Sequence, residues 1–301
     1  MTELEFRPWQ DRDDLNLNEL WGDAPSPSAS AARALFRPES DTPVVRTLVA
    51  EREGIPVAAG YIVEASIHPG RAWAYVEVAT QERRAGVGTA LLTALREAVA
   101  GTRIDGLPLR AKVAPGAAGE AFAQAAGFRT LQRSRMVQLE AGALPAPDVD
   151  EARDAALHIE VVATGSVELT TALWDWYAAA HQDWDPAANP GIGRVNAMFL
   201  GEASGARAAA ILRRNGKLRA FAISYAEEGD ESPAELLVGT SVAEGAEGGS
   251  DDVRALIGQL IVDHPVEVEV DDSLGSVAEV VDEVVAAGKG RVVSETLVIG
   301  T

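Results

Sequence analysis

The sequence has no cysteine and is short of basic and aromatic residues. Its 301 residues include 26 Lys and Arg against 46 Asp and Glu, and aromatic residues make up 5%. Without cysteine the chain can form neither disulfides nor thiolate metal sites, and it has no cysteine nucleophile. The four histidines stand singly in the sequence, so we expect no metal site.

The shortage of basic charge argues against a nucleic-acid partner. The net charge of −20 is uneven: residues 1–150 carry 16 Lys and Arg and 20 Asp and Glu (−4), and residues 151–301 carry 10 and 26 (−16). Binding a phosphate backbone requires a basic face. An acidic surface is typical of a soluble protein, and it also attracts cationic or amine-bearing substrates.

Long apolar runs are missing as well. No run approaches the roughly 20 residues that span a bilayer, and residues 1–5 have neither the basic start nor the apolar segment of a signal peptide. We therefore expect a cytoplasmic protein with no membrane partner. The length predicts about two domains.

Residues 141–157 are rich in Ala, Pro and Asp and lack periodicity, which is typical of a linker. They divide the chain into predicted domains 1–140 and 158–301. The first domain is predicted to contain strands at 44–51, 55–64, 72–80, 107–113 and 129–140, and helices at 86–100 and 117–126. The second is predicted to contain strands at 206–214, 217–225, 234–242, 266–270 and 291–299, and helices at 253–262 and 277–287. Because a helix that joins two strands favours a parallel pair, each domain is predicted to be α+β with a mixed sheet.

Residues 78–92 read VATQERRAGVGTALL. Here a strand ends, a basic glycine-rich loop follows and a helix begins. A helix start offers unpaired backbone N–H groups and partial positive charge, and glycines let a ligand approach closely. This arrangement suits a pyrophosphate. The spacing is also compatible with an ordinary strand-to-helix turn, but it fits neither a Rossmann fingerprint, because residue 91 is Leu, nor a P-loop.

The segment resembles the acetyl-coenzyme A loop of the GNAT superfamily of N-acetyltransferases, with the signature Arg/Gln-x-x-Gly-x-Gly/Ala. The later Gly127-Phe128 pair fits the same family pattern, and the resemblance covers about residues 2–140. It implies two tandem GNAT-like acyl-CoA N-acyltransferase domains, an architecture similar to that of mycothiol synthase. It also implies an N-acetyltransferase that uses acetyl-CoA, without a metal, to acetylate a small amine-bearing substrate. The chain would be a monomer or a homodimer.

The resemblance also implies cofactor-binding residues. Two belong to the strand and the others to the loop and the helix start: Val76, Val78, Arg83, Arg84, Ala85, Gly86, Val87, Gly88 and Thr89. The sequence departs from the family at Ala123, where a Tyr commonly serves as the acid, and at Gly116, where an Asn is common. These departures keep open an alternative, a non-catalytic acyl-CoA-binding or regulatory protein.

Three residues are candidates for acting on the acceptor. Glu77, beside Val78, is the candidate general base. The alternative is that its side chain points to solvent from a half-exposed strand and has no catalytic role. Trp176 and Asp183 are candidate substrate residues, because an aromatic wall and a carboxylate can hold an ammonium group. The alternative for Trp176 is a place in the hydrophobic core.

The second domain carries an acidic loop at the corresponding place. Matching Ala90-Leu91-Leu92 with Ala255-Leu256-Ile257 sets Gly248 opposite Arg83 and Asp251 opposite Gly86. Residues 244–252 contain no arginine, and a carboxylate about 4 Å from a phosphate costs up to ~4 kcal/mol near a protein surface. We therefore expect the second domain to be degenerate and not to bind coenzyme A.

Overall fold

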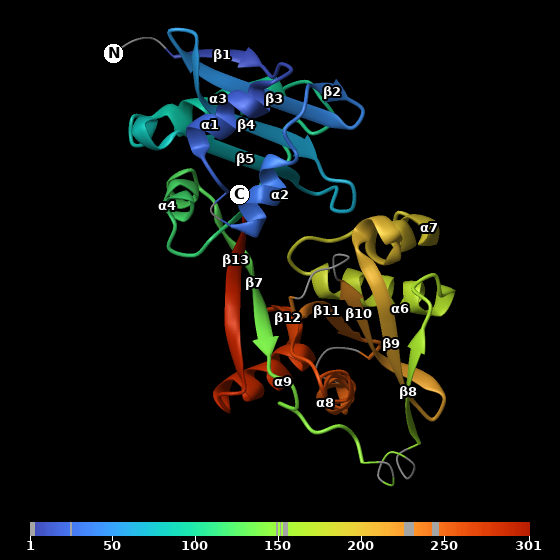
Figure 1. Ribbon diagram of the computed structural model, residues 1–301. Helices are drawn as coiled ribbons and strands as arrows, with labels where there is room; N and C mark the ends of the chain where they lie inside the picture. Colours follow the sequence, from blue (N-terminus) through green and yellow to red (C-terminus); the bar gives the residue numbers. More distant parts are fainter. Residues whose placement is uncertain are drawn as a thin grey trace. The chain divides into compact units, whose positions relative to one another are not determined.

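The computed structural model describes residues 4–24, 26–148, 150, 152, 156–225, 232–242 and 247–301. The chain forms two compact units, unit 1 (Met1–Leu131 and Thr296–Thr301) and unit 2 (Gln132–Glu295). Both boundaries fall inside long strands, β7 (Arg129–Leu139) and β13 (Gly290–Gly300) (Figure 1). The predicted boundaries instead placed 132–140 in the first domain and 296–301 in the second.

Unit 1 is built on a mixed sheet with the strand order β1-β3-β4-β5-β6-β13. Its strands and helices are β1 (Glu5–Pro8), α1 (Asp13–Trp21), α2 (Pro27–Arg33), β2 (Ser40–Asp41), β3 (Val44–Arg52), β4 (Ile55–Glu64), β5 (Ala72–Val78), η1 (Thr80–Glu82), α3 (Val87–Ala98), β6 (Leu109–Val113) and α4 (Ala118–Ala125). The pairs are antiparallel except for β5 with β6, which is parallel as predicted. Residues Leu297–Gly300 of β13 complete the sheet beside β6.

The two faces of this sheet are covered by different helices. The face that contacts α3 and α4 forms the larger core, which includes Ile62, Leu91 and Leu95. The opposite face has a smaller core centred on Leu17 of α1 and on Tyr61, with Phe36 beside it. Because side chains alternate along a strand, Val76 and Val78 belong to the α3 face and Tyr75 and Glu77 to the other.

Unit 2 repeats this arrangement with the strand order β13-β7-β12-β11-β10-β9-β8. Its further elements are β8 (Leu157–Val162), α6 (Val167–His181), α7 (Ile192–Val195), η2 (Asn196–Leu200), η3 (Glu202–Ser204), β9 (Ala206–Arg214), β10 (Lys217–Tyr225), β11 (Ala234–Thr240), α8 (Gly249–Leu260), β12 (Val266–Asp271) and α9 (Gly275–Ala286). Strands β11 and β12 form the parallel pair. In the part of the chain that the structure describes, no helix is both long and apolar enough to cross a bilayer.

A constant offset of 162 residues relates the two units from β3 to α3. The first residues of the matched elements are 44 and 206, 55 and 217, 72 and 234, and 87 and 249. The offset of 165 assumed in the sequence alignment is therefore wrong by three residues, and the helix predicted to begin at 253 begins at Gly249. Gly86 and Gly248 precede the two helices with the same left-handed conformation, at φ 82° and 80°.

Two hairpin turns have the residues that such turns favour, and the predicted linker is partly packed. Glu53-Gly54 and Asn215-Gly216 all have positive φ, as tight two-residue hairpin turns require. Within 141–157, the Gly142 N–H donates to the Ile261 carbonyl at 2.7 Å, and a side chain at Gly258 would collide with the Pro145 carbonyl oxygen. Residues 149, 151 and 153–155 of the predicted linker lie outside the described residues.

Candidate functional site

The loop between β5 and α3 is shaped by its glycines and arginines. Gly86 stands immediately before α3, and its carbonyl accepts from the Ala90 N–H at 3.0 Å. The Arg83 Nε donates to the Val78 carbonyl at 3.0 Å, which ties the loop back to the end of the strand. Arg84 adopts a left-handed conformation (φ 67°) and is exposed. The loop therefore presents two exposed arginines beside a helix start, and one of them is tied to the end of the strand.

The first turn of α3 supplies backbone donors. The N–H groups of Val87, Gly88 and Thr89 have no acceptor within the helix, because the first intrahelical bond is made by Ala90. A Cβ at Gly88 would lie 3.3 Å from the Phe122 ring and 3.5 Å from the Val78 side chain. Glycine thus lets the helix start pack closely against the Phe122 ring, and its unpaired N–H groups remain available to an anion.

Strand β5 has a backbone edge that β6 leaves unpaired. The parallel pairing with β6 covers only Ala72 and Trp73, so the two strands diverge before Val76 and Val78. The side chains of these valines pack against the α3 core, which leaves their backbone groups on this edge for an extended ligand arm, apart from the Val78 carbonyl that Arg83 engages. The nine predicted cofactor residues therefore lie together, two on this edge and seven on the loop and first turn.

Glu77 lies on the opposite face of β5, 9% exposed and hydrogen-bonded on both oxygens. The Arg33 Nη2 donates to its Oε1 at 2.7 Å and the Arg33 Nε to its Oε2 at 2.9 Å. The Tyr75 hydroxyl also donates to Oε2, at 2.7 Å. Burial, followed by the charge of Glu77, raises the pKa of Tyr75 far above its ordinary value. The hydrogen bonds that Arg33 donates to Glu77 are the main cause of the raised pKa of Arg33. Accepting a proton from an amine would compete with these bonds.

A pocket of about 310 Å³ in unit 1 includes Arg33 in its wall. It is lined by Trp9, Asp14, Asn18, Trp21, Arg33, Ala34 and Phe36. The rings of Trp9 and Phe36 stack at 4.9 Å, and the Arg33 guanidinium lies 5.2 Å from the Trp21 ring centroid. Neither this pocket nor the role of Arg33 could be predicted from the sequence, because 44 residues separate Arg33 from Glu77 and no local pattern marks their pairing.

The two positions that depart from the family pattern supply no acid. Ala123 is buried in the α3 core. Gly116 adopts φ 70° and its N–H donates to the Glu120 carboxylate at 2.7 Å. Neither side chain can donate a proton to a leaving thiolate.

Unit 2 differs from unit 1 at both matched sites. Next to Gly248, the buried Asp252 accepts from the Arg214 Nε at 2.5 Å and from the Arg219 Nε at 2.7 Å. Residues 243–246, which include part of the predicted acidic loop, lie outside the described residues. Gly239 stands at the place of Glu77, and a Cβ there would lie 2.4 Å from Phe221 and 2.9 Å from Trp176.

The predicted substrate residues are not brought together by the structure. Trp176 is 8% exposed and its ring meets that of Phe221 edge-on, with centroids 5.6 Å apart, so it packs in the core of unit 2. Asp183 is exposed in the turn after α6. Trp176 also lines a second pocket, whose lining residues do not include Asp183.

Comparison with known proteins identifies the fold. No protein-family model matches the sequence, and none of the curated proteins matches it. Among solved structures, the chain is similar to a GCN5-related N-acetyltransferase from Sphaerobacter thermophilus, with 13% identity and a TM-score of 0.66. The match covers 100% of this chain and 96% of the other. It is also similar to a tandem GNAT protein from the clavulanic acid biosynthesis pathway, with 18% identity and a TM-score of 0.62. This match covers 99% of this chain and 98% of the other. A third match, over 100% of this chain and 90% of the other, is a putative acetyltransferase from Pyrococcus horikoshii (15% identity, TM-score 0.53). The chain has a tandem GNAT-type fold of the α+β class.

Proposed function

We propose that the chain is an N-acetyltransferase that binds acetyl-CoA in unit 1 and acetylates a small amine. The observation that carries this proposal is the loop from Val78 to Thr89, where an unpaired strand edge meets a glycine-preceded helix start and two arginines. The strand edge suits the amide-bearing arm of coenzyme A, and the helix start suits its pyrophosphate. The GNAT-type fold of the solved structures that match the whole chain supports the same reading.

The acceptor would approach from the Glu77 face of the sheet. When bound, acetyl-CoA would supply a thioester whose acetyl group passes to a neutral amine as the C–S bond breaks and coenzyme A leaves, to be released as the free thiol. Glu77 is the buried carboxylate next to Val78, and it would receive the proton that the amine releases. Arg33 and Tyr75 would hold this carboxylate in place. The aromatic pocket beside Arg33 would exclude water from the amine.

Charge reversal at the exposed arginine of the loop tests the cofactor site. Isothermal titration with coenzyme A should show binding to the wild type and a roughly 10- to 100-fold weaker affinity for Arg84→Glu, because a charge-assisted phosphate contact contributes about 1.5–3 kcal/mol. Arg96→Glu is the matched control, since it makes the same charge change in the last turn of α3. Equal affinities of the two variants would contradict a pyrophosphate site at this loop.

A second candidate function is a non-catalytic acyl-CoA-binding protein. It is favoured by the three hydrogen bonds that already engage Glu77 and by the apolar surroundings of Ala123. Release of free thiol from acetyl-CoA, followed with a broad panel of primary amines, separates the two functions. Thiol release that depends on an amine and is lost in Glu77→Gln supports the enzyme. Coenzyme A binding without thiol release for any amine supports the second function.

A further inference from the structure

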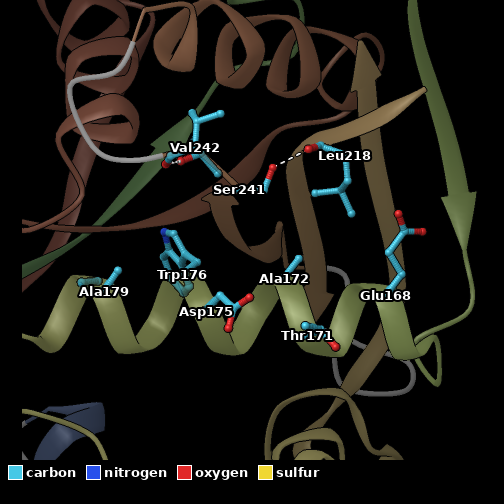
Figure 2. A pocket seen from close by; sticks show the side chains of 11 residues that line it. Glu168, Thr171, Ala172, Asp175, Trp176, Ala179, Leu218, Ser241 and Val242 are labelled. Atoms are coloured by element: carbon cyan, nitrogen blue, oxygen red, sulfur yellow. Dashed lines mark hydrogen bonds between the residues drawn. The ribbon is translucent and has the colours of Figure 1, made fainter. Parts of the chain in front are cut away.

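A pocket of about 480 Å³ in unit 2 is not used by the proposed reaction. It lies between α6 and the ends of β10 and β11, and Figure 2 shows the helix on one side and the strands on the other. Its lining includes Glu168, Ala172, Asp175, Trp176, Ala179 and Val242. The volume falls in the range of small-molecule sites.

Most of the lining is apolar or already satisfied. Ala172 and Ala179, one helical turn to either side of Asp175 and Trp176, leave room beside the helix (Figure 2). The Ser241 hydroxyl donates to the Leu218 carbonyl and the Thr240 hydroxyl to the Val242 carbonyl at 2.9 Å. The pocket wall therefore suits an apolar group more than a strongly hydrogen-bonded one.

One buried polar group of the lining has no partner. The indole N–H of Trp176 is buried, and among the described residues it finds no hydrogen-bond acceptor. Buried indole N–H groups are usually hydrogen-bonded, so an orphaned donor in a pocket wall is unusual. A ligand that enters the pocket would change the surroundings of this group, which makes it a reporter for binding.

The charge at the pocket is entirely negative among the described residues. Its charged lining residues are Glu168 and Asp175. Glu168 is held from outside by Arg213, with Nη2 to Oε2 at 2.6 Å. Asp175 is exposed and has no ion pair within the described part of the chain. A negatively charged ligand such as coenzyme A would be repelled here, whereas an ammonium group could pair with Asp175.

We infer that this pocket binds a small amine with an apolar body. The apolar body lies along Ala172, Ala179 and Val242, and the ammonium group pairs with Asp175. The site belongs to unit 2 and does not depend on acetyl transfer, so the inference stands or falls separately from the proposed function.

Three probes that share a phenethyl group and differ in their polar end test the charge preference. Calorimetric titrations without coenzyme A would compare phenethylammonium, 2-phenylethanol and 3-phenylpropionate. The ammonium probe should bind about fivefold more tightly than the alcohol, as expected for a solvent-exposed ion pair, and the carboxylate should bind most weakly. Equal affinities for ammonium and alcohol would overturn the role of Asp175.

Variants of α6 locate the binding site. Asp175→Asn should abolish the preference for ammonium over alcohol, whereas Asp183→Asn, which removes an exposed carboxylate outside the pocket, should keep it. Ala172→Leu should fill the pocket and weaken all binding at least tenfold. Ala179→Leu provides a second filling variant at an exposed position if Ala172→Leu misfolds.

Nuclear magnetic resonance supplies a direct readout. The indole ¹⁵N–¹H signal of Trp176, assigned by its loss in Trp176→Phe, should shift on titration with phenethylammonium. Binding that persists in both filling variants, or that leaves the Trp176 signal unchanged, would show that the probe binds elsewhere and would overturn the inference.

Discussion

Glu77 in unit 1 and Gly239 in unit 2 occupy matched positions, yet their surroundings are reversed. Glu77 lies across the sheet from Ala59, and Gly239 from Phe221. In unit 1 the small Ala59 lies opposite the large polar Glu77. In unit 2 the large aromatic Phe221 lies opposite Gly239, which has no side chain. In unit 2 the space of the carboxylate is filled by the rings of Phe221 and Trp176. The position that holds a buried carboxylate in one unit is hydrophobic core in the other.

The two units also differ at the helix starts, where a matched arginine pairs with a carboxylate at a different place in each unit. Arg52 and Arg214 are matched by the 162-residue offset. Arg52 pairs with Glu82 in the loop before α3, at 2.8 Å, whereas Arg214 pairs with Asp252 inside the first turn of α8. In unit 2 the helix start thus holds a buried carboxylate. In unit 1 it carries no acidic residue and remains open to an anion.

The parallel strand pairs also differ in charge, with unit 2 the more acidic of the two. Where β5 meets β6, the Arg110 guanidinium lies 3.9 Å from the Trp73 ring centroid. At the matched place in unit 2, Glu235 lies directly opposite Glu267. The shared backbone therefore presents cationic and aromatic groups in one unit and carboxylates in the other. The duplicated fold constrains where strands and helices lie, but it does not constrain the charge of the ligand.

The largest expected effect comes from making unit 2 resemble unit 1 at Gly239. Gly239→Glu would drive a side chain into Phe221 and Trp176 and bury a charge without an arginine partner. We expect unit 2 to lose about 4 kcal/mol or more of unfolding free energy. Urea titration followed by tryptophan fluorescence and circular dichroism measures the loss.

Two further substitutions separate the causes at Gly239. Gly239→Ala introduces only the Cβ collision and should cost about 1–3 kcal/mol. Gly165→Glu places the same charge where a Cβ meets nothing within 4 Å, and it should change stability by no more than about 0.5 kcal/mol. If Gly239→Glu were as stable as this control, the reversed packing would not be what excludes a carboxylate from unit 2.

Sequence patterns predicted the repeated scaffold well because each matched element has a local signal. Asn215-Gly216 and Glu53-Gly54 mark hairpins by turn chemistry, and the helix after Gly86 has a clear apolar period. The start of α8 was missed because Asp251 and Asp252 look like capping residues, although Gly248 precedes the helix.

Other features depend on contacts that no local signal reveals. The pairing of Arg33 with Glu77 joins residues far apart in the sequence. The pairing of Leu297–Gly300 with β6 joins the end of the chain to unit 1. The proposed cofactor loop could be predicted because its residues lie within one short segment, whereas the proposed acceptor side is assembled from several.

The second prediction concerns the carboxylate that closes the helix start of unit 2. Asp252→Ala should cost about 3 kcal/mol of unfolding free energy, because it leaves Arg214 and Arg219 without their buried partner. The arginines are partly exposed and can turn toward water, which limits the loss. Asp251→Ala, at the exposed neighbour, should cost less than about 1 kcal/mol. Coenzyme A affinity, measured by titration, should be unchanged in both variants, because removing one carboxylate should not create a coenzyme A site in unit 2. A second coenzyme A bound by Asp252→Ala would contradict this expectation.

The smallest expected effect is at the paired carboxylates of β11 and β12. Partial desolvation, and then the charges of Glu267 and Glu269, raise the pKa of Glu235 above its ordinary value, although its side chain is exposed on the strand. Folding therefore favours the protonated acid: its contribution to stability is complete below the unfolded pKa of about 4.3 and is lost as the pH rises through the folded value. Glu235→Gln cannot ionise, so at pH 7 it should be about 0.5 kcal/mol more stable than the wild type. This advantage should disappear near pH 3.5. Urea midpoints at the two pH values measure the difference, with Glu202→Gln as the exposed control in the same unit. If Glu235→Gln were more stable than the wild type by the same amount at both pH values, repulsion between carboxylates would not explain the difference. The contrast in charge with the Trp73–Arg110 pair of unit 1 would then have no effect on stability.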